Sequence, residues 1–142
     1  MTQTVETALR GAPLYSDDTI YVMLTLPLTA ITAAAGVVAE ISEPFTALIV
    51  DKDEVTLVLT ASEVEEFSRR LPGAQRSSMT YRLLTLDVAL EPTLVGFMAR
   101  VSAALADAGV SILPFAAYTR DHLLVPENQF EQARTALAML TG

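Results

Sequence analysis

The second half of this chain carries strand and helix signals in an order that few folds accommodate. Residues 81–90, YRLLTLDVAL, predict a strand, and Pro92 suits the first turn of a helix after it. An apolar stripe of helical period, closed by Gly109, follows at Leu94, Phe97, Met98, Val101, Leu105 and Ala108. Two further β-rich runs, residues 110–118 and 122–125, surround a turn at residues 119–121 and precede a last helical pattern. The order strand, helix, strand, strand, helix predicts most of a βαββαβ unit, an antiparallel sheet with two helices on one face.

The first half repeats this order less clearly. Residues 20–26 alternate in hydropathy and end at Pro27, which predicts a strand, and residues 45–60 read as two β-rich runs around a charged turn. Residues 28–43 are ambiguous, because their alanines favour a helix while threonines and Gly36 weaken it. The first half therefore predicts a second, degenerate unit of the same class.

A short helix is expected after the strands of the first half. Ser62 and Glu65 have the spacing of a capping box, in which hydroxyl and carboxylate satisfy free N–H groups at the helix start. Pro72 and Gly73 end this helix. The polar run at residues 74–78 is the best candidate for a linker between the halves.

These patterns predict an α+β fold made of tandem ferredoxin-like units. We expect a flexible arm over residues 1–18, a first half over residues 19–78 and a second half over residues 79–142. The second half ends before a fourth strand, so we expect an N-terminal segment or the other half to complete its sheet. A single half would be marginally stable alone, and its open sheet edges would invite further pairing.

The composition excludes several function classes. A chain of 142 residues with no cysteine and one histidine has no disulfide, thiolate metal site, cysteine nucleophile or multi-histidine site. The net charge of −8 argues against a nucleic-acid binder. His122 has no serine or cysteine motif around it and is interpreted as a strand-edge residue, and the lone Asn128 disfavours an acylphosphatase-like hydrolase. We expect no catalytic residue, metal or cofactor.

The uncharged run at residues 19–39 is long enough to span a bilayer, but the rest of its composition disfavours this. It contains Pro27, Gly36 and several threonines, acidic residues flank both ends, and no basic cluster supplies an orientation signal. Residues 1–18 lack the pattern of a signal peptide. We therefore expect a cytoplasmic protein without a membrane partner.

Residues 86–125 resemble an ACT domain, and most closely the paired ACT modules of the CASTOR-like group, which are related to the regulatory domains of aspartate kinases. The matching features are Gly96 near the helix start, Leu105–Gly109 at the helix end, Ser111–Ile112, the turn from Tyr118 to Asp121, and Leu123–Val125. In the first half, the run from Asp53 to Val58 is similar to the preceding module of that group. The resemblance covers residues 20–141.

The resemblance implies a non-enzymatic regulatory module that binds a small ligand, usually an amino acid, where the first strand passes into the first helix. A helix N-terminus offers N–H groups and a partial positive charge to a ligand carboxylate. The matching positions are Glu91, Thr93, Leu94, Val95, Gly96, Ile112, Leu113, Pro114 and Phe115. Glu91 is expected to receive an ammonium group and Thr93 to bind a carboxylate. Such sites lie between ACT units, so a homodimer is expected.

Three departures from the family pattern favour an alternative function. Val95 stands where related modules carry a hydroxyl, Ala116-Ala117 replaces a Ser-Thr pair, and Thr119-Arg120 replaces a more usual Asp-Thr. Fewer hydroxyl groups leave fewer polar contacts to orient a ligand. The alternative is a protein-interaction or assembly module that keeps the ACT fold without the ligand. In that case Glu91 is a favourable charge at a helix start, and Gly96 is a packing contact.

Overall fold

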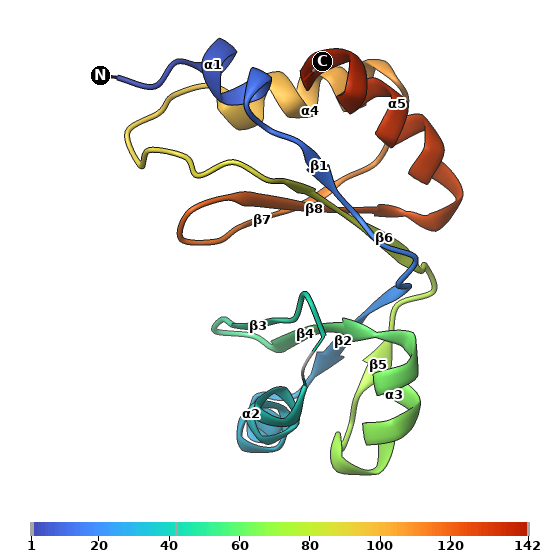
Figure 1. Cartoon of the computed structure of the whole chain (residues 1–142). Helices are drawn as coiled ribbons and strands as arrows, with labels where there is room; N and C mark the ends of the chain where they lie inside the picture. The colour runs from blue at the N-terminus through green and yellow to red at the C-terminus, as the bar shows by residue number, and fades with distance from the viewer. Residues whose placement is uncertain (1, 42, 142) are drawn as a thin grey trace. The chain divides into compact units, whose positions relative to one another are not determined.

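The computed structural model describes residues 2–41 and 43–141, which form two compact units (Figure 1). Unit 1 comprises residues 1–18 and 81–142, and unit 2 comprises residues 19–80. In each unit the helices cover one face of an antiparallel sheet (Figure 1). The fold is therefore α+β and is built from tandem ferredoxin-like units, as the sequence predicts.

The sheet of unit 1 has the strand order β1-β6-β8-β7, with antiparallel neighbours throughout. Its elements are α1 (Val5–Arg10), β1 (Leu14–Tyr15), β6 (Tyr81–Leu86), α4 (Phe97–Asp107), β7 (Leu113–Ala116), β8 (Asp121–Pro126), η3 (Glu127–Gln129) and α5 (Phe130–Thr141). β1 pairs with β6 through Leu14 opposite Leu86 and Tyr15 opposite Thr85. The N-terminal segment thus supplies the fourth strand, which was one of the two expected ways to complete this sheet.

The prediction of a flexible arm over residues 1–18 is wrong. Thr4 caps α1, because its Oγ1 accepts the N–H of Thr7 at 3.1 Å. Ala8 and Leu9 are 1% and 2% exposed and belong to the core of unit 1. The arm is ordered because its apolar residues are buried against elements from the other end of the chain, which local sequence patterns do not report.

Unit 2 has the same topology, with the strand order β5-β2-β4-β3. Its elements are β2 (Tyr21–Leu26), η1 (Leu28–Ala30), α2 (Ile31–Glu40), β3 (Ala47–Val50), β4 (Val55–Thr60), α3 (Ala61–Phe67), η2 (Ser68–Arg70) and β5 (Gln75–Arg76). The run at residues 74–78, expected to be a linker, contains β5. It pairs with β2 through Arg76 opposite Leu24 and Gln75 opposite Thr25, so this polar run closes the sheet of unit 2.

In unit 2, the structure of residues 28–43 and the position of the capping box differ from what the sequence patterns indicate. Most of the ambiguous run at residues 28–43 is helical, because Ala34 and Val37 of α2 are fully buried; Ser42 lies outside the described residues. The capping box of α3 is formed by Thr60 and Glu63, two residues before the predicted pair. The last β4 residue thus doubles as the helix cap.

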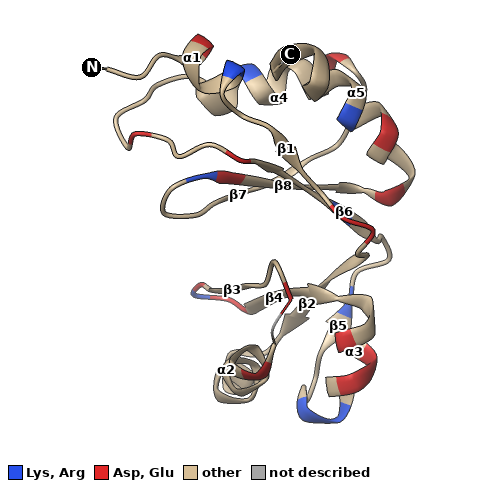
Figure 2. Ribbon diagram, in the orientation of Figure 1, with Lys and Arg blue, Asp and Glu red and all other residues tan. Residues whose placement is uncertain are grey.

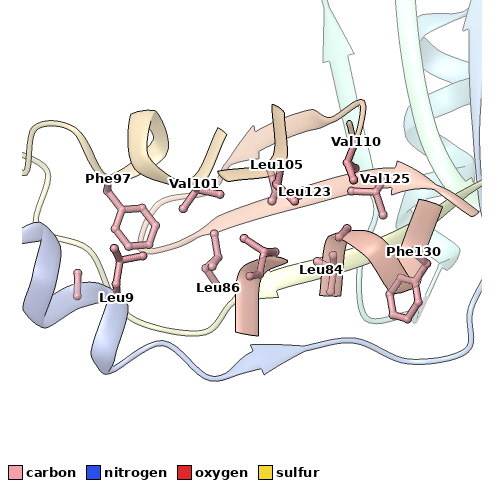
Figure 3. Packing of buried hydrophobic residues seen from close by; sticks show 13 residues of the cluster. Leu9, Leu84, Leu86, Phe97, Val101, Leu105, Val110, Leu123, Val125 and Phe130 are labelled. Atoms are coloured by element: carbon pink, nitrogen blue, oxygen red, sulfur yellow. The ribbon is translucent and has the colours of Figure 1, made fainter. Parts of the chain in front are cut away.

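The core of unit 1 lies between its sheet and its helices (Figure 3). The buried side chains of α4 are Phe97, Val101 and Leu105, as the predicted apolar stripe requires. The helix itself begins at Phe97 rather than near Pro92, because Gly96 has a φ of +94° that interrupts the helical path. Leu94 therefore packs on this core from a loop.

The distribution of charge and the length of the helices bear on nucleic-acid binding and on membrane insertion. Figure 2 shows basic and acidic residues interspersed over both units rather than gathered into a basic surface on the described part of the chain. Within residues 2–41 and 43–141, every helix is too short or too polar to cross a bilayer. The uncharged run at residues 19–39 is divided between β2, η1 and α2.

Candidate functional site

A pocket of about 380 Å³ opens in unit 1 at the end of the sheet where β6 leads toward α4. Three segments surround it: the loop after β6, the first turn of α4, and the turn between β7 and β8. The lining residues are Leu90, Glu91, Pro92, Leu94, Gly96, Phe97, Met98, Ala99, Ala116, Ala117, Tyr118, Thr119, Arg120 and Asp121. The pocket therefore lies at the strand-to-helix passage that the resemblance indicates.

Backbone hydrogen bonds hold the two loops of the pocket together. The Leu94 N–H donates to the Glu91 carbonyl at 3.0 Å, which closes a turn within the first loop. The Leu90 N–H donates to the Thr119 carbonyl at 2.6 Å and joins that loop to the β7–β8 turn. The second turn is closed by the Ala117 N–H, which donates to the Arg120 carbonyl at 3.0 Å. Both walls thus have defined backbone conformations.

The N-terminus of α4 opens onto this pocket. Gly96 is its N-cap residue and has no side chain to accept a hydrogen bond from the following N–H groups. The intrahelical ladder begins with the Arg100 N–H, which donates to the Gly96 carbonyl at 3.1 Å. The N–H groups of residues 97–99 precede that ladder, and the first turn contains no acidic residue. This helix end favours an anion.

Charged side chains surround the same opening. The Arg120 guanidinium pairs with the Asp87 carboxylate, and both are partly exposed. Burial raises the pKa of Asp121, while the neighbouring His122 acts in the opposite sense. Asp121 thus places a partly desolvated carboxylate on the pocket wall.

Glu91 already has a partner within the chain. Both of its carboxylate oxygens lie 3.2 Å from the backbone nitrogen of Gln3, which donates to them. In return, the Glu91 N–H donates to Oε1 of Gln3 at 2.8 Å. The carboxylate that we expected to receive a ligand ammonium therefore binds the N-terminal segment.

The other predicted site residues divide between the wall and its surroundings. Leu94 and Gly96 line the pocket with Glu91. Thr93 and Val95 belong to the same loop but not to the lining, and Val95 is 86% exposed. Residues 112–115 lie just before the lining segment of the β7–β8 turn. Among the described strands β7 is an edge strand that pairs with β8, and this position accommodates Pro114 and its missing N–H.

Besides Leu90 and Pro92, sequence reasoning missed two groups of lining residues. Phe97–Ala99 were assigned to a helix interior, because the helix was expected to begin earlier. Residues 116–121 belong to the turn that helped to indicate the family. The hydroxyl groups missing at Ala116 and Ala117 counted against ligand binding, but no residue of this turn was among the predicted ligand contacts. Its lining position follows from the β7–β8 pairing, in which Ala116 stands opposite Asp121.

No constellation for metal binding is present among the described residues: no three histidine, aspartate or glutamate side chains in residues 2–41 and 43–141 converge on a common point. His122 lies in β8, outside the pocket lining, where its Nδ1 is 2.8 Å from Oγ1 of Thr85. Burial lowers its pKa, so the neutral ring is favoured. This geometry fits a strand residue held by its cross-strand neighbour.

The family model of the ACT domain matches residues 76–138, which contain the whole pocket lining. This part of the chain matches the ACT domain family. The predicted resemblance to paired ACT modules is confirmed by this match together with the structural neighbours below. No protein of curated function matches the sequence significantly.

Solved structures extend the ACT comparison to both units. A Vibrio cholerae protein of unknown function, described as a possible transport protein, is 27% identical, with a TM-score of 0.72 over 98% of this chain and 97% of its own. An Agrobacterium tumefaciens protein is 20% identical, with a TM-score of 0.65 over 90% and 87% of the two chains. The ligand-free regulatory subunit of aspartate kinase from Thermus thermophilus is 14% identical, with a TM-score of 0.65 over 90% and 97%. At this identity the last two comparisons show the tandem ACT fold.

Proposed function

We propose that this protein is a non-enzymatic regulatory module of the cytoplasm that senses an amino acid in the ACT pocket of unit 1. The observation that carries the proposal is the pairing of two opposite electrostatic features in one pocket. The uncapped N-terminus of α4 favours a carboxylate, and Asp121 on the wall favours an ammonium group. A free amino acid carries both groups.

Each charged group of the ligand has a proposed partner. The ligand carboxylate binds the N–H groups at the start of α4, where Gly96 lets it approach the backbone closely. Arg120, also on the wall, adds positive charge on the side of the β7–β8 turn. Asp121 receives the ammonium group, a role that we assign to it rather than to Glu91, because Glu91 binds Gln3. Leu94 and Met98 provide apolar contacts for a side chain.

The pocket is proposed to be shared between two copies of the chain. Two large apolar residues lie on its flanking loops and are exposed, Val95 at 86% and Tyr118 at 99%. A second ACT unit over these loops would cover them and close the open side of the pocket. Thr93 and residues 112–115, which flank the lining, are then contacts at that interface. The likeness to an aspartate kinase regulatory subunit supports a regulatory role for the fold.

A thermal-shift screen against the twenty amino acids tests the proposal. We expect a rise in melting temperature with one or a few of them, since a ligand at one hundred times its Kd adds about 2.7 kcal/mol of stability. Asp121→Asn preserves the shape of the wall and should abolish the rise. Asp107→Asn, an exposed residue at the far end of α4, is the matched control and should keep it. A flat screen on folded protein would exclude amino acids as the ligand.

The hydroxyl-poor wall at Ala116 and Ala117 favours a second candidate, an assembly module that has lost the ligand. This candidate predicts a flat screen even after Ala116→Ser and Ala117→Thr restore the hydroxyl groups. It also predicts that Val95→Ser with Tyr118→Ser weakens association with one dominant partner in a pull-down. Sedimentation of the same double variant separates self-association from binding to another protein: a shift to monomer identifies the partner as a second copy.

A further inference from the structure

Gln3, in the N-terminal segment at residues 2–10, makes several hydrogen bonds to the pocket loop. Its backbone N–H donates to both oxygens of Glu91 at 3.2 Å, and its Oε1 accepts the Glu91 N–H at 2.8 Å. Its Nε2 donates to the Ala89 carbonyl at 3.0 Å. These contacts span 86 and 88 residues of sequence and include both backbone and side chain of Gln3. Gln3 and Glu91 therefore each use their backbone N–H and their side chain to bind the other.

The residues after Gln3 fix the same segment to the first turns of α4. Val5 Cγ2 lies 3.8 Å from the position that a β-carbon on Gly96 would occupy, and Glu6 pairs with Arg100 at 3.3 Å. Figure 3 shows Leu9 pointing toward Phe97, and both belong to the core of unit 1. One continuous segment thus contacts the loop and the helix start, which are two of the three walls of the pocket.

We propose that Gln3 is a positioning residue of the pocket, and that the N-terminal segment at residues 2–10 clamps the loop at residues 87–96 in its ligand-binding conformation. This loop lacks regular secondary structure, so its conformation depends on a small number of hydrogen bonds. The Gln3 contacts fix residues 89 and 91, on either side of Leu90, whose N–H bonds the opposite wall. Release of Gln3 frees both sides of that bond.

Coupling of this kind is reciprocal. A clamp that favours the binding conformation raises ligand affinity, and a bound ligand must stabilise the clamp by the same factor. The segment would then report occupancy of the pocket to whatever contacts α1. The clamp is defined by contacts within the chain, and its link to affinity rests on the proposed function.

Amide hydrogen exchange without any ligand tests the clamp. Gln3→Ala removes the bonds to Ala89 and to the Glu91 N–H, so faster exchange at Glu91 itself would be trivial. The informative amides are those of Leu90 and Leu94, whose own acceptors, Thr119 and Glu91 carbonyls, are unchanged. We expect these two to exchange roughly 5- to 30-fold faster, as the loss of one or two net hydrogen bonds predicts. Gln132→Ala, an exposed glutamine of α5, should leave both rates unchanged.

A global loss of stability is separated from the clamp by an amide in the sheet. Leu84 lies at the centre of β6 and pairs with Leu123, and its exchange should not change in Gln3→Ala. If all three amides accelerate together, or if Leu90 and Leu94 keep their wild-type rates, Gln3 does not position the loop and the proposal is overturned. Gln3→Asn, one methylene shorter, should accelerate Leu90 and Leu94 like Gln3→Ala, because its amide does not reach both partners.

The second arm measures affinity with the amino acid that gives the largest shift in the screen. Gln3→Ala should raise the Kd for this amino acid by at least about fivefold, while Gln132→Ala should leave the Kd unchanged. Unchanged affinity with a mobile loop would overturn the coupling to ligand. A flat screen with accelerated Leu90 and Leu94 would refute the proposed function and leave the clamp supported, so the two failures are distinguishable.

Discussion

Thr85 and His122 stand opposite each other in β6 and β8, with Thr85 Oγ1 2.8 Å from His122 Nδ1. Thr85 is 5% exposed, so its hydroxyl is held where solvent does not compete for it. Burial lowers the pKa of His122, because the charged ring is less well solvated in the folded protein than in the unfolded chain. Protonation of His122, the single histidine, is therefore coupled to unfolding.

Acidification should destabilise the protein through His122. With a folded-state pKa below the unfolded value, the unfolded chain binds more protons, so this contribution to stability is complete above pH 6.5 and is lost as pH falls. The slope stays below the single-proton limit of about 1.4 kcal/mol per pH unit, because the ring is half-buried and partly screened. Urea unfolding of wild type and His122→Gln between pH 7.5 and 5 measures it, and the variant should show the flatter profile.

Asp121 should act in the opposite sense at lower pH. Its pKa is raised mainly by burial, so the folded state binds the extra proton and stability falls as pH rises through the folded-state pKa. At pH 7 the variant Asp121→Asn should be at least as stable as wild type, since no charge is then desolvated. Unfolding midpoints at pH 7 and pH 4 check this: a variant less stable than wild type at pH 7 would show that the carboxylate is stabilised rather than strained.

Two glycine substitutions should change stability in opposite directions. Gly96 has a φ of +94°, which a residue with a β-carbon adopts at a cost, so Gly96→Ala should lose about 1–3 kcal/mol. Gly36 lies inside α2, where an added β-carbon would meet the Arg70 side chain at an ordinary 3.7 Å. Gly36→Ala should therefore gain about 0.5–1 kcal/mol. Thermal unfolding of the two variants measures these changes. If both variants lost or both gained the same stability, the result would contradict this difference in backbone conformation.

The cap of α3 makes a second matched pair. Thr60 Oγ1 accepts the Glu63 N–H at 3.1 Å, and Glu63 Oε1 accepts the Thr60 N–H at 2.9 Å. Both residues are buried, so Thr60→Ala should cost about 1–2 kcal/mol and Thr60→Ser much less. Ser62→Ala removes the hydroxyl that the sequence pattern favours as the cap. Denaturant midpoints decide between the two positions. A larger loss of stability for Ser62→Ala than for Thr60→Ala would mean that Ser62, and not Thr60, caps the helix.

A core truncation in unit 1 should be the most damaging single change of this series. Leu105 of α4 is fully buried in the cluster of Figure 3, so Leu105→Ala should cost about 2–5 kcal/mol by leaving a cavity. Met139→Ala on α5, a residue 82% exposed, should stay within about 0.5 kcal/mol of wild type. Equilibrium urea unfolding measures both, and a Leu105→Ala loss as small as that of Met139→Ala would mean that the site collapses around the missing side chain.

Much of each unit is already determined by local patterns. The alternation of residues 20–26 gives β2, in which Val22, Leu24 and Leu26 enter the core. The stripe through Phe97, Val101 and Leu105 predicts α4, because apolar residues spaced by about 3.6 positions lie on one face of a helix and that face is buried. The order of these elements then restricts the topology to the βαββαβ arrangement.

The completed sheets and the pocket depend on contacts that no local window contains. β1 and β5 are two residues long, too short for any alternation, and they are strands because the folded chain pairs them with β6 and β2. Gln3 and Glu91 are 88 residues apart in the sequence. The local sequence around Glu91 does not distinguish a glutamate that contacts a ligand from one that contacts another part of the chain. Local periodicity thus determined which segments bury a face, whereas tertiary packing decided which partners satisfy their remaining hydrogen bonds, because such bonds form wherever the folded backbone brings donor and acceptor together.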